Sequence, residues 1–359
     1  MVWLANPMKL FDTIRGANLY FILIVIILYF INLLTKAFRW YLLVDSSGTK
    51  VSFKKTFPLY IISLALNNVT PGKIGGEPVR AYLLNKEAEV PIGQGIASIF
   101  AEKMMDIIVI ATMAIIGAVF ILPLLPIETS RYLVVAIILA IGGIIISVYI
   151  VSHSTLLNKT VDRSINFAMK VSKRDFVKRL SLALVGFVDR FKYGMNEILK
   201  ARRSASACIF LTVIIWINEA IRLFLIILAL PTDIDISIGV VFIASSIANV
   251  IGFAIPLGAG NILGIPAVLV IYGISNEIAV TTAFLQTATS IWISVPLGAA
   301  AILITGLKVY KVSKSNNKAG TSDSANKKTK HSNTKESTIR ITNPNNKKVK
   351  LPTYNPKKV

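Results

Sequence analysis

The chain alternates long apolar runs with shorter polar connections. Several runs can cross the hydrocarbon core of a bilayer, for which a helix needs about 20 residues. The runs are unbroken, which favours helices over the alternating strands of a membrane barrel. The candidate spans are Leu19–Thr35, Ile107–Leu122, Tyr132–Val151, Ala207–Leu230, Ile236–Ile255 and Ala279–Thr305. The pattern predicts an all-α polytopic membrane protein with about seven or eight membrane segments.

The first polar interruption is "NNVTPGKIGGEPVRAYLL", which begins at Asn67 and directly follows the apolar stretch Phe57–Leu66. That stretch is only ~15 Å long as a helix, about half of the hydrocarbon core. It predicts a re-entrant half-helix that breaks at Asn67–Gly76 and returns to the side from which it entered. Irregular backbone at membrane depth is tolerated where it is buried in protein or lines a cavity. The break therefore predicts a cavity.

A second interrupted segment, "IPLGAGNILGIPAVLVIYG", lies in the other half of the chain. Paired discontinuous helices at the interface of inverted repeats form the sites of many transporters, so an inverted pseudo-repeat is one arrangement that fits. The alternative is that glycine and proline only permit close helix packing. The predicted gating positions in the two breaks are Pro71, Gly75, Gly76, Pro256, Gly258 and Gly260.

Composition and charge support this interpretation. Apolar residues make up 54% of the 359 positions and charged residues 16%, which is far from a soluble domain. Of the net charge of +21, all but one unit lies in residues 153–205 and 307–359. Basic segments that flank spans stay cytoplasmic. We therefore expect a membrane-embedded domain over 1–306, with a cytoplasmic amphipathic loop at 153–205, and a disordered, basic cytoplasmic tail at 307–359 in the cell membrane.

The two basic segments predict contact with anionic lipid. Apolar residues from Phe176 to Ile198 recur at helical spacing among cations, which indicates an amphipathic helix on the inner leaflet. A surface helix packed on the bundle is the alternative. The tail is polycationic and from Ser313 onward has only Tyr354 as an aromatic residue, which favours attraction to lipid headgroups over nucleic-acid binding.

The segment Lys36–Thr56 carries five cations against Asp45 and is predicted to be a cytoplasmic linker after the first span. Trp40 and Tyr41 would then lie in the interfacial belt.

Charges inside the spans are the candidate site residues, because a charge at the bilayer centre costs at least ~2.5–3.5 kcal/mol without a partner or a wet cavity. Glu77 and Arg80 are one helical turn apart and pair if Pro78 begins a helix. That helix start, with Lys73 nearby, would offer free N–H groups to an anion such as a phosphate. Anchoring at the headgroup level is the alternative.

Two further pairs of charges lie within apolar runs. Glu102 and Asp106 share one helix face, either as proton carriers, as counter-ions of Arg80 or Lys73, or at the cytoplasmic surface. Glu219 and Arg222 are one turn apart, which predicts a cavity-facing pair or a structural one. The predicted substrate-binding residues are Asn68, Lys73, Glu77, Arg80, Glu102, Asp106, Glu219 and Arg222.

Catalytic and cofactor motifs are missing from the sequence. It contains no phosphate loop, dinucleotide fingerprint or Ser-His-Asp arrangement, and Cys208 is the only cysteine beside two histidines. We therefore expect no cofactor and no metal site, and the sequence does not favour an enzyme.

The runs "RWYLLVDSSGTKVSFKKTF", "NNVTPGKIGGEPVRAYLL", "ASIFAEKMMDIIV" and "PLGAGNILGIPAVLVIYGIS" resemble the lysylphosphatidylglycerol synthetase transmembrane-region family of flippase-like membrane proteins, UPF0104-type, and its archaeal members in particular. The resemblance covers about Leu10 to Leu307. It implies a membrane-embedded lipid-handling fold, since relatives move an aminoacylated phospholipid between leaflets or are linked to polyprenyl-phosphate sugars. Its motif positions here are Asn68, Pro71, Gly75, Gly76, Glu77, Arg80, Glu102 and Asp106.

The expected function is thus that of a lipid flippase or scramblase-like carrier for an anionic phospholipid or a polyprenyl-phosphate-linked lipid. One alternative is a noncatalytic membrane partner of a lipid-modifying enzyme. The other is an intramembrane transferase in lipid-linked glycan or aminoacyl-lipid synthesis, with Glu102 or Asp106 as its base.

Overall fold

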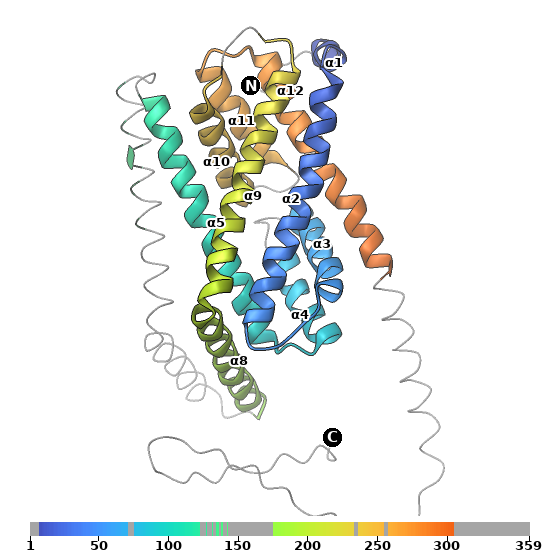
Figure 1. Ribbon diagram of the computed structural model, residues 1–359, viewed down its shortest axis with the longest axis vertical. Helices are drawn as coiled ribbons and strands as arrows, with labels where there is room; N and C mark the ends of the chain where they lie inside the picture. The colour runs from blue at the N-terminus through green and yellow to red at the C-terminus, as the bar shows by residue number, and fades with distance from the viewer. Residues whose placement is uncertain are drawn as a thin grey trace, which may run out of the picture. The chain divides into compact units, whose positions relative to one another are not determined.

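The structure is a computed structural model that describes residues 7–70, 75–122, 175–232, 236–254 and 258–304, with isolated positions between 127 and 142. All of them belong to the first of two units into which the chain divides, Met1–Leu307. The regular elements in these ranges are helices, which confirms the predicted all-α fold (Figure 1). Most of the predicted span Tyr132–Val151, residues 153–174 of the predicted loop, and the tail lie outside the described residues.

The helices form two series along the chain. The first consists of α1 (Pro7–Arg15), α2 (Leu19–Ser46), α3 (Phe53–Val69), α4 (Gly76–Ala88) and α5 (Ile92–Ile121). The second consists of α8 (Asp175–Lys200), α9 (Arg202–Ala229), α10 (Ile238–Ala254), α11 (Ala259–Ile271) and α12 (Asn276–Ala288), after which residues 291–304 are again helical. Within the described residues, three helices are long and apolar enough to cross a membrane: Leu19–Ser46, Arg202–Ala229 and Asn276–Ile304.

The predicted re-entrant segment is present as a hairpin of the two short helices α3 and α4, which pack against each other. Their 17 and 13 residues correspond to about 26 and 20 Å, less than the ~30 Å core of a bilayer. Helix α3 ends at Val69 because the next residue, Thr70, precedes a proline and adopts an extended conformation (φ −103°, ψ 144°). The turn is closed by the Asn67 side chain, whose Oδ1 accepts the N–H of Gly76 at 2.8 Å.

A second hairpin of the same construction is formed by α10 and α11, again of 17 and 13 residues. Helix α11 begins after Gly258, whose φ of +81° is in the left-handed region that glycine adopts without strain. Both hairpins are tight at a glycine, because a methyl group at Gly76 would meet the carbonyl oxygen of Ser63 and one at Gly260 that of Ala248.

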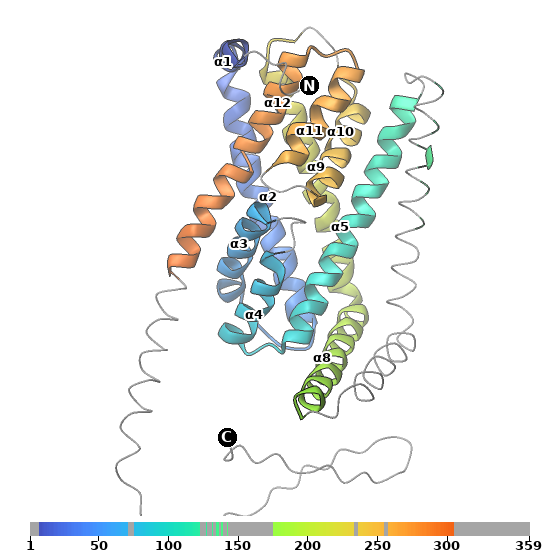
Figure 2. The same cartoon turned by 180° about the vertical axis from the view of Figure 1, so that it is seen from behind.

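The two series run in opposite directions. Helices of 28, 17, 13 and 30 residues (α2 to α5) are matched by helices of 28, 17 and 13 residues (α9 to α11) and the 29-residue span Asn276–Ile304. The N–H of Asn18, at the start of α2, donates to the carbonyl of Ala229, at the end of α9, at 2.8 Å. Figure 2 shows α3 and α4 toward the end of the bundle where α8 lies, and α10 and α11 toward the α1 end. This is the geometry of an inverted repeat.

The predicted linker Lys36–Thr56 is wrong in its first half, because α2 continues to Ser46. Lys36 and Arg39 therefore lie within a helix. Trp40 is fully buried instead of interfacial. The charges are tolerated there because each has a partner on a neighbouring helix.

The amphipathic helix α8 packs on the start of α5 over its second half. Phe191 lies edge-on to Phe100 with ring centroids 5.9 Å apart, and Gly194 closely approaches Gln94. Leu184 and Phe187 remain exposed. Packing on the bundle, the alternative for this helix, therefore holds for its second half, while an apolar edge stays open.

Candidate functional site

A cavity of about 490 Å³ lies between the two hairpins. It is lined from α3 and α4 on one side, from α10 and α11 on the other, and from α2, α5, α9 and α12 around them. Charged residues of both signs line it: Lys36, Arg39, Glu77, Arg80, Glu102, Lys103, Asp106 and Glu219. The sequence prediction of a cavity at the break is therefore confirmed.

One charged cluster is centred on Arg39 of α2. Its Nη1 lies 2.6 Å from Asp106 Oδ1, and its Nη2 lies 3.0 Å from Glu102 Oε1. Glu102 Oε2 in turn lies 2.9 Å from Nη2 of Arg80. Trp216 donates its indole N–H to Asp106 at 3.0 Å. Glu102 and Asp106 are therefore counter-ions of buried guanidinium groups, and the surface position considered for them is wrong.

Arg80 is part of the cavity wall. Its guanidinium lies 4.6 Å from the ring centroid of Trp40 and 5.1 Å from that of Tyr60, which are cation–π distances. The predicted pairing with Glu77 is wrong: Glu77 instead lies 2.8 Å from Nζ of Lys103. Helix α4 starts at Gly76, before Pro78, and presents both side chains to α5, which carries the Lys103 and Glu102 partners.

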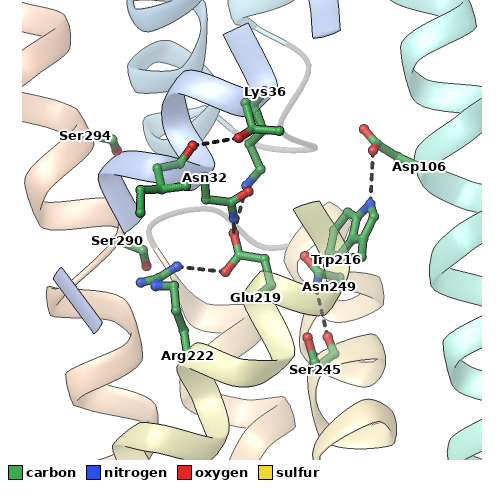
Figure 3. Close-up of polar contacts among 12 residues, drawn as sticks. Asn32, Lys36, Asp106, Trp216, Glu219, Arg222, Ser245, Asn249, Ser290 and Ser294 are labelled. Carbon is green, nitrogen blue, oxygen red and sulfur yellow. Dashed lines mark hydrogen bonds and ion pairs between the residues drawn. The ribbon is translucent and has the colours of Figure 1, made fainter. Parts of the chain in front are cut away.

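The second charged cluster is centred on Glu219 of α9 (Figure 3). Glu219 Oε1 accepts from Nζ of Lys36 at 2.7 Å and from Nδ2 of Asn32 at 3.0 Å. Its Oε2 accepts from Nη1 of Arg222 at 2.8 Å. Arg222 also donates to the carbonyl of Thr289 at 3.1 Å and has no exposed surface. The predicted Glu219–Arg222 pair is present, and Glu219 is its cavity-facing member.

Neutral amides also line the cavity. Asn68 donates to Ser294 Oγ at 2.6 Å, Asn249 to the carbonyl of Ser245 at 2.8 Å, and Asn261 to Thr287 Oγ1 at 3.3 Å. The bonds of Asn68 and Asn261 tie the hairpin tips to neighbouring helices, whereas that of Asn249 lies within α10.

The start of α4 is less open to an anion than the sequence predicted. The N–H of Gly75 donates to Oγ1 of Thr70 at 3.2 Å, and that of Gly76 is taken by Asn67. Three predicted residues, Lys73, Pro71 and Pro256, lie outside the described residues.

Sequence reasoning missed Lys36, Arg39, Lys103 and Trp216 as cavity residues. A signal for the first two existed: Asn32, Lys36 and Arg39 are spaced by four and three residues, which places them on one helix face. This spacing was not used, because the positive charge of the segment Lys36–Thr56 favoured a linker there.

Comparison with known families identifies the family of the chain. The family model described as "Lysylphosphatidylglycerol synthase TM region" matches residues 1–298. The chain belongs to this family. The resemblance stated from the motifs is therefore confirmed, and the protein is a multi-pass membrane protein.

Relatives of this lysylphosphatidylglycerol synthase TM-region protein are described as UPF0104 membrane proteins. One from Methanothermobacter thermautotrophicus is 29% identical over 318 residues, covering 86% of this chain and 92% of its own. One from Pyrococcus horikoshii is 24% identical over 315 residues (84% and 92%), and one from Methanocaldococcus jannaschii is 25% identical over 313 (84% and 90%). No solved structure matches the chain.

Proposed function

We propose that this protein is a flippase or scramblase-like carrier that moves the headgroup of an anionic phospholipid or polyprenyl-phosphate-linked lipid across the membrane. One observation carries the proposal: a charged cavity lies between two opposed helical hairpins inside an otherwise apolar bundle. A polar headgroup cannot cross hydrocarbon without such a path, because each desolvated charge there costs several kcal/mol.

The size of the cavity indicates which part of the lipid enters. A volume of about 490 Å³ lies within the ordinary range of small-molecule sites and accommodates a headgroup, but not two acyl chains. The chains would stay in the bilayer, along the outer faces of the bundle. These faces expose apolar side chains such as Ile108, Ile116 and Ile217.

The opposed hairpins supply a means of alternating access. Inverted repeats that enclose a central site can open it to either side by exchanging their conformations. Here a side-chain hydrogen bond ties the tip of each hairpin to a neighbouring helix, through Asn68 on α3 and Asn261 on α11. The glycine crossings at Gly76 and Gly260 would let each pair of helices move as one body.

The charged residues have two roles in this proposal. Arg80, Glu102 and Asp106 hold the wall and set its electrostatic potential, because Arg80 is paired with Glu102 and Asp106 with the buried Arg39. Asn68 and Glu77 are assigned to the headgroup at the tip of the first hairpin, and Glu219 of α9 faces it from the second series. Lys73 keeps its assignment to the headgroup from the sequence alone.

The transferase alternative finds little support in the geometry. A general base needs an oxygen directed at its substrate. The oxygens of Glu102 face Arg39 and Arg80, and those of Asp106 face Arg39 and Trp216. A carrier needs no such base.

The test is a leaflet-accessibility assay in proteoliposomes with fluorescent anionic, sugar-phosphate and neutral lipids. Wild type should expose anionic lipid of the inner leaflet to a membrane-impermeant quencher faster than protein-free vesicles do. Glu77→Gln and Arg80→Gln should slow it, and the exposed Lys50→Gln, outside the cavity, should not. Equal rates for wild type and protein-free vesicles would remove the carrier function.

A further inference from the structure

Helices α2 and α9 occupy matching positions in the two inverted series, and their contacts are reciprocal. Lys36 of α2 and Glu219 of α9 are 183 residues apart, and the same interval separates Arg39 from Arg222 and Tyr29 from Thr212. Arg39 donates to Thr212 at 2.8 Å, and Arg222 lies over the Tyr29 ring at 5.2 Å. These reciprocal contacts relate α2 and α9 by a pseudo-two-fold axis.

The Lys36–Glu219 ion pair lies on that axis. Two equivalent points of a two-fold arrangement can touch only where both are next to the axis, and Nζ of Lys36 lies 2.7 Å from Glu219 Oε1. In inverted-repeat carriers the axis lies in the membrane plane and the substrate site lies at the repeat interface. The pair therefore marks the midpoint of the path through the cavity.

Lys36 is also the cavity cation whose departure from its carboxylate leaves the fewest buried groups without a partner. The guanidinium groups of Arg39, Arg80 and Arg222 are buried and each is held by a carboxylate, whereas 22% of the Lys36 side chain is exposed. If Lys36 leaves Glu219, that carboxylate keeps Arg222 and Asn32. If Lys103 leaves Glu77, no other hydrogen-bond partner of Glu77 is found among the described residues.

The charge around the axis is asymmetric in a way that admits an anion. In α5 the corresponding interval is 184 residues, one more than in α2. It relates the acidic Glu102 and Asp106 to Gln286 and Ser290 in the second series. Both of these line the cavity. The second half therefore presents an amide and a hydroxyl where the first presents two carboxylates, and a phosphate that approaches Lys36 from that half meets no carboxylate at these positions.

We propose that Lys36 binds the phosphate of the headgroup at the midpoint of the path, and that Glu219 is its resident counter-ion when the site is empty. Binding exchanges one ion pair for another: the phosphate oxygen replaces Glu219 at the ammonium group, and Glu219 stays with Arg222 and Asn32. Because every charged group has a partner before and after the exchange, the phosphate can bind and leave again. The inference rests on the proposed carrier function for its ligand class, a phosphate ester.

Binding is measured on purified full-length protein in detergent, from the rise of the unfolding temperature with ligand concentration, which gives Kd. The probes are a short-chain phosphatidylglycerol, inorganic phosphate and an uncharged short-chain diacylglycerol. Lys36→Gln should raise Kd for the phospholipid at least about tenfold, since it removes a charge-assisted contact. Glu219→Gln should lower Kd, because the competing carboxylate is gone. Lys36→Arg should bind nearly as wild type does, and Lys50→Gln is the matched control.

The opposite signs distinguish a binding role from a structural one. If Lys36 and Glu219 only stabilised the bundle, both variants would weaken binding in parallel, and that result would overturn the proposal. The double variant should bind as weakly as Lys36→Gln alone; binding as tight as Glu219→Gln would also overturn it. Stabilisation by inorganic phosphate but not by the phospholipid would refute the headgroup assignment, and stabilisation by diacylglycerol alone would refute the ionic contact.

The role of Lys36 and the carrier function can be refuted independently of each other. Wild type that moves lipid while Lys36→Gln and Glu219→Gln bind as wild type refutes the role of Lys36 and leaves the carrier function standing. The predicted pattern of Kd values without any transport refutes the carrier function and leaves Lys36 as the phosphate-binding residue.

Discussion

Replacement of Arg39 by methionine tests whether the buried charge cluster holds the first half of the protein together. Arg39 is almost fully buried and bonds Asp106 and Glu102 on α5. Without it, Asp106 keeps the indole N–H of Trp216 as its hydrogen-bond donor among the described side chains, while Glu102 keeps Arg80. Loss of one partner from a buried ion pair destabilises by about 3–5 kcal/mol. Because Glu102 stays paired, we expect about 3 kcal/mol, the lower end of that range.

The assay is reversible unfolding in mixed micelles followed by circular dichroism, with Lys50→Met as the control. Lys50 pairs with Asp45 at 2.7 Å but is exposed, so its loss should change stability by less than about 0.5 kcal/mol. Adding Asp106→Asn to Arg39→Met should recover part of the loss, since it removes the stranded charge. A loss below about 1 kcal/mol for Arg39→Met, or no recovery in the double variant, would refute the account of the cluster.

Three further outcomes are expected. Gly76→Ala should lower the unfolding temperature, because the added methyl group meets the carbonyl of Ser63, whereas Gly186→Ala, with open space around it, should be neutral or stabilising; equal effects would contradict the tight crossing. Trp40→Leu should destabilise by about 2 kcal/mol or more in the same unfolding assay, because this fully buried side chain loses packing volume, the cation–π contact to Arg80 and the indole hydrogen bond to Ser98; a loss below about 1 kcal/mol would contradict its role in the wall. Cys208, which has no exposed surface, should resist maleimide labelling until the protein is unfolded, and rapid labelling of the native protein would contradict its burial.

The architecture was readable in the sequence because apolar runs and helix breakers act locally. The hydrophobic length of a segment decides whether it can span, and Pro71 and Gly258 decide where α3 ends and α11 begins, through the backbone conformations that they impose or permit. Membership of the family followed from the same motif residues. The candidate acids were found for a related reason, since Glu102, Asp106 and Glu219 are conspicuous in apolar surroundings.

Pairing was decided by the tertiary structure. Glu77 and Arg80 are neighbours on one helix, yet each pairs with α5, because that helix brings an opposite charge closer than the chain itself does. The sequence placed Lys36 and Arg39 in a linker. In the folded protein they pair with Glu219 of α9 and Asp106 of α5. An ion pair depends on the distance between groups that can be 183 residues apart, and a one-dimensional pattern contains no such distance. Periodicity therefore predicts elements, while partners are determined by how the two inverted halves pack together.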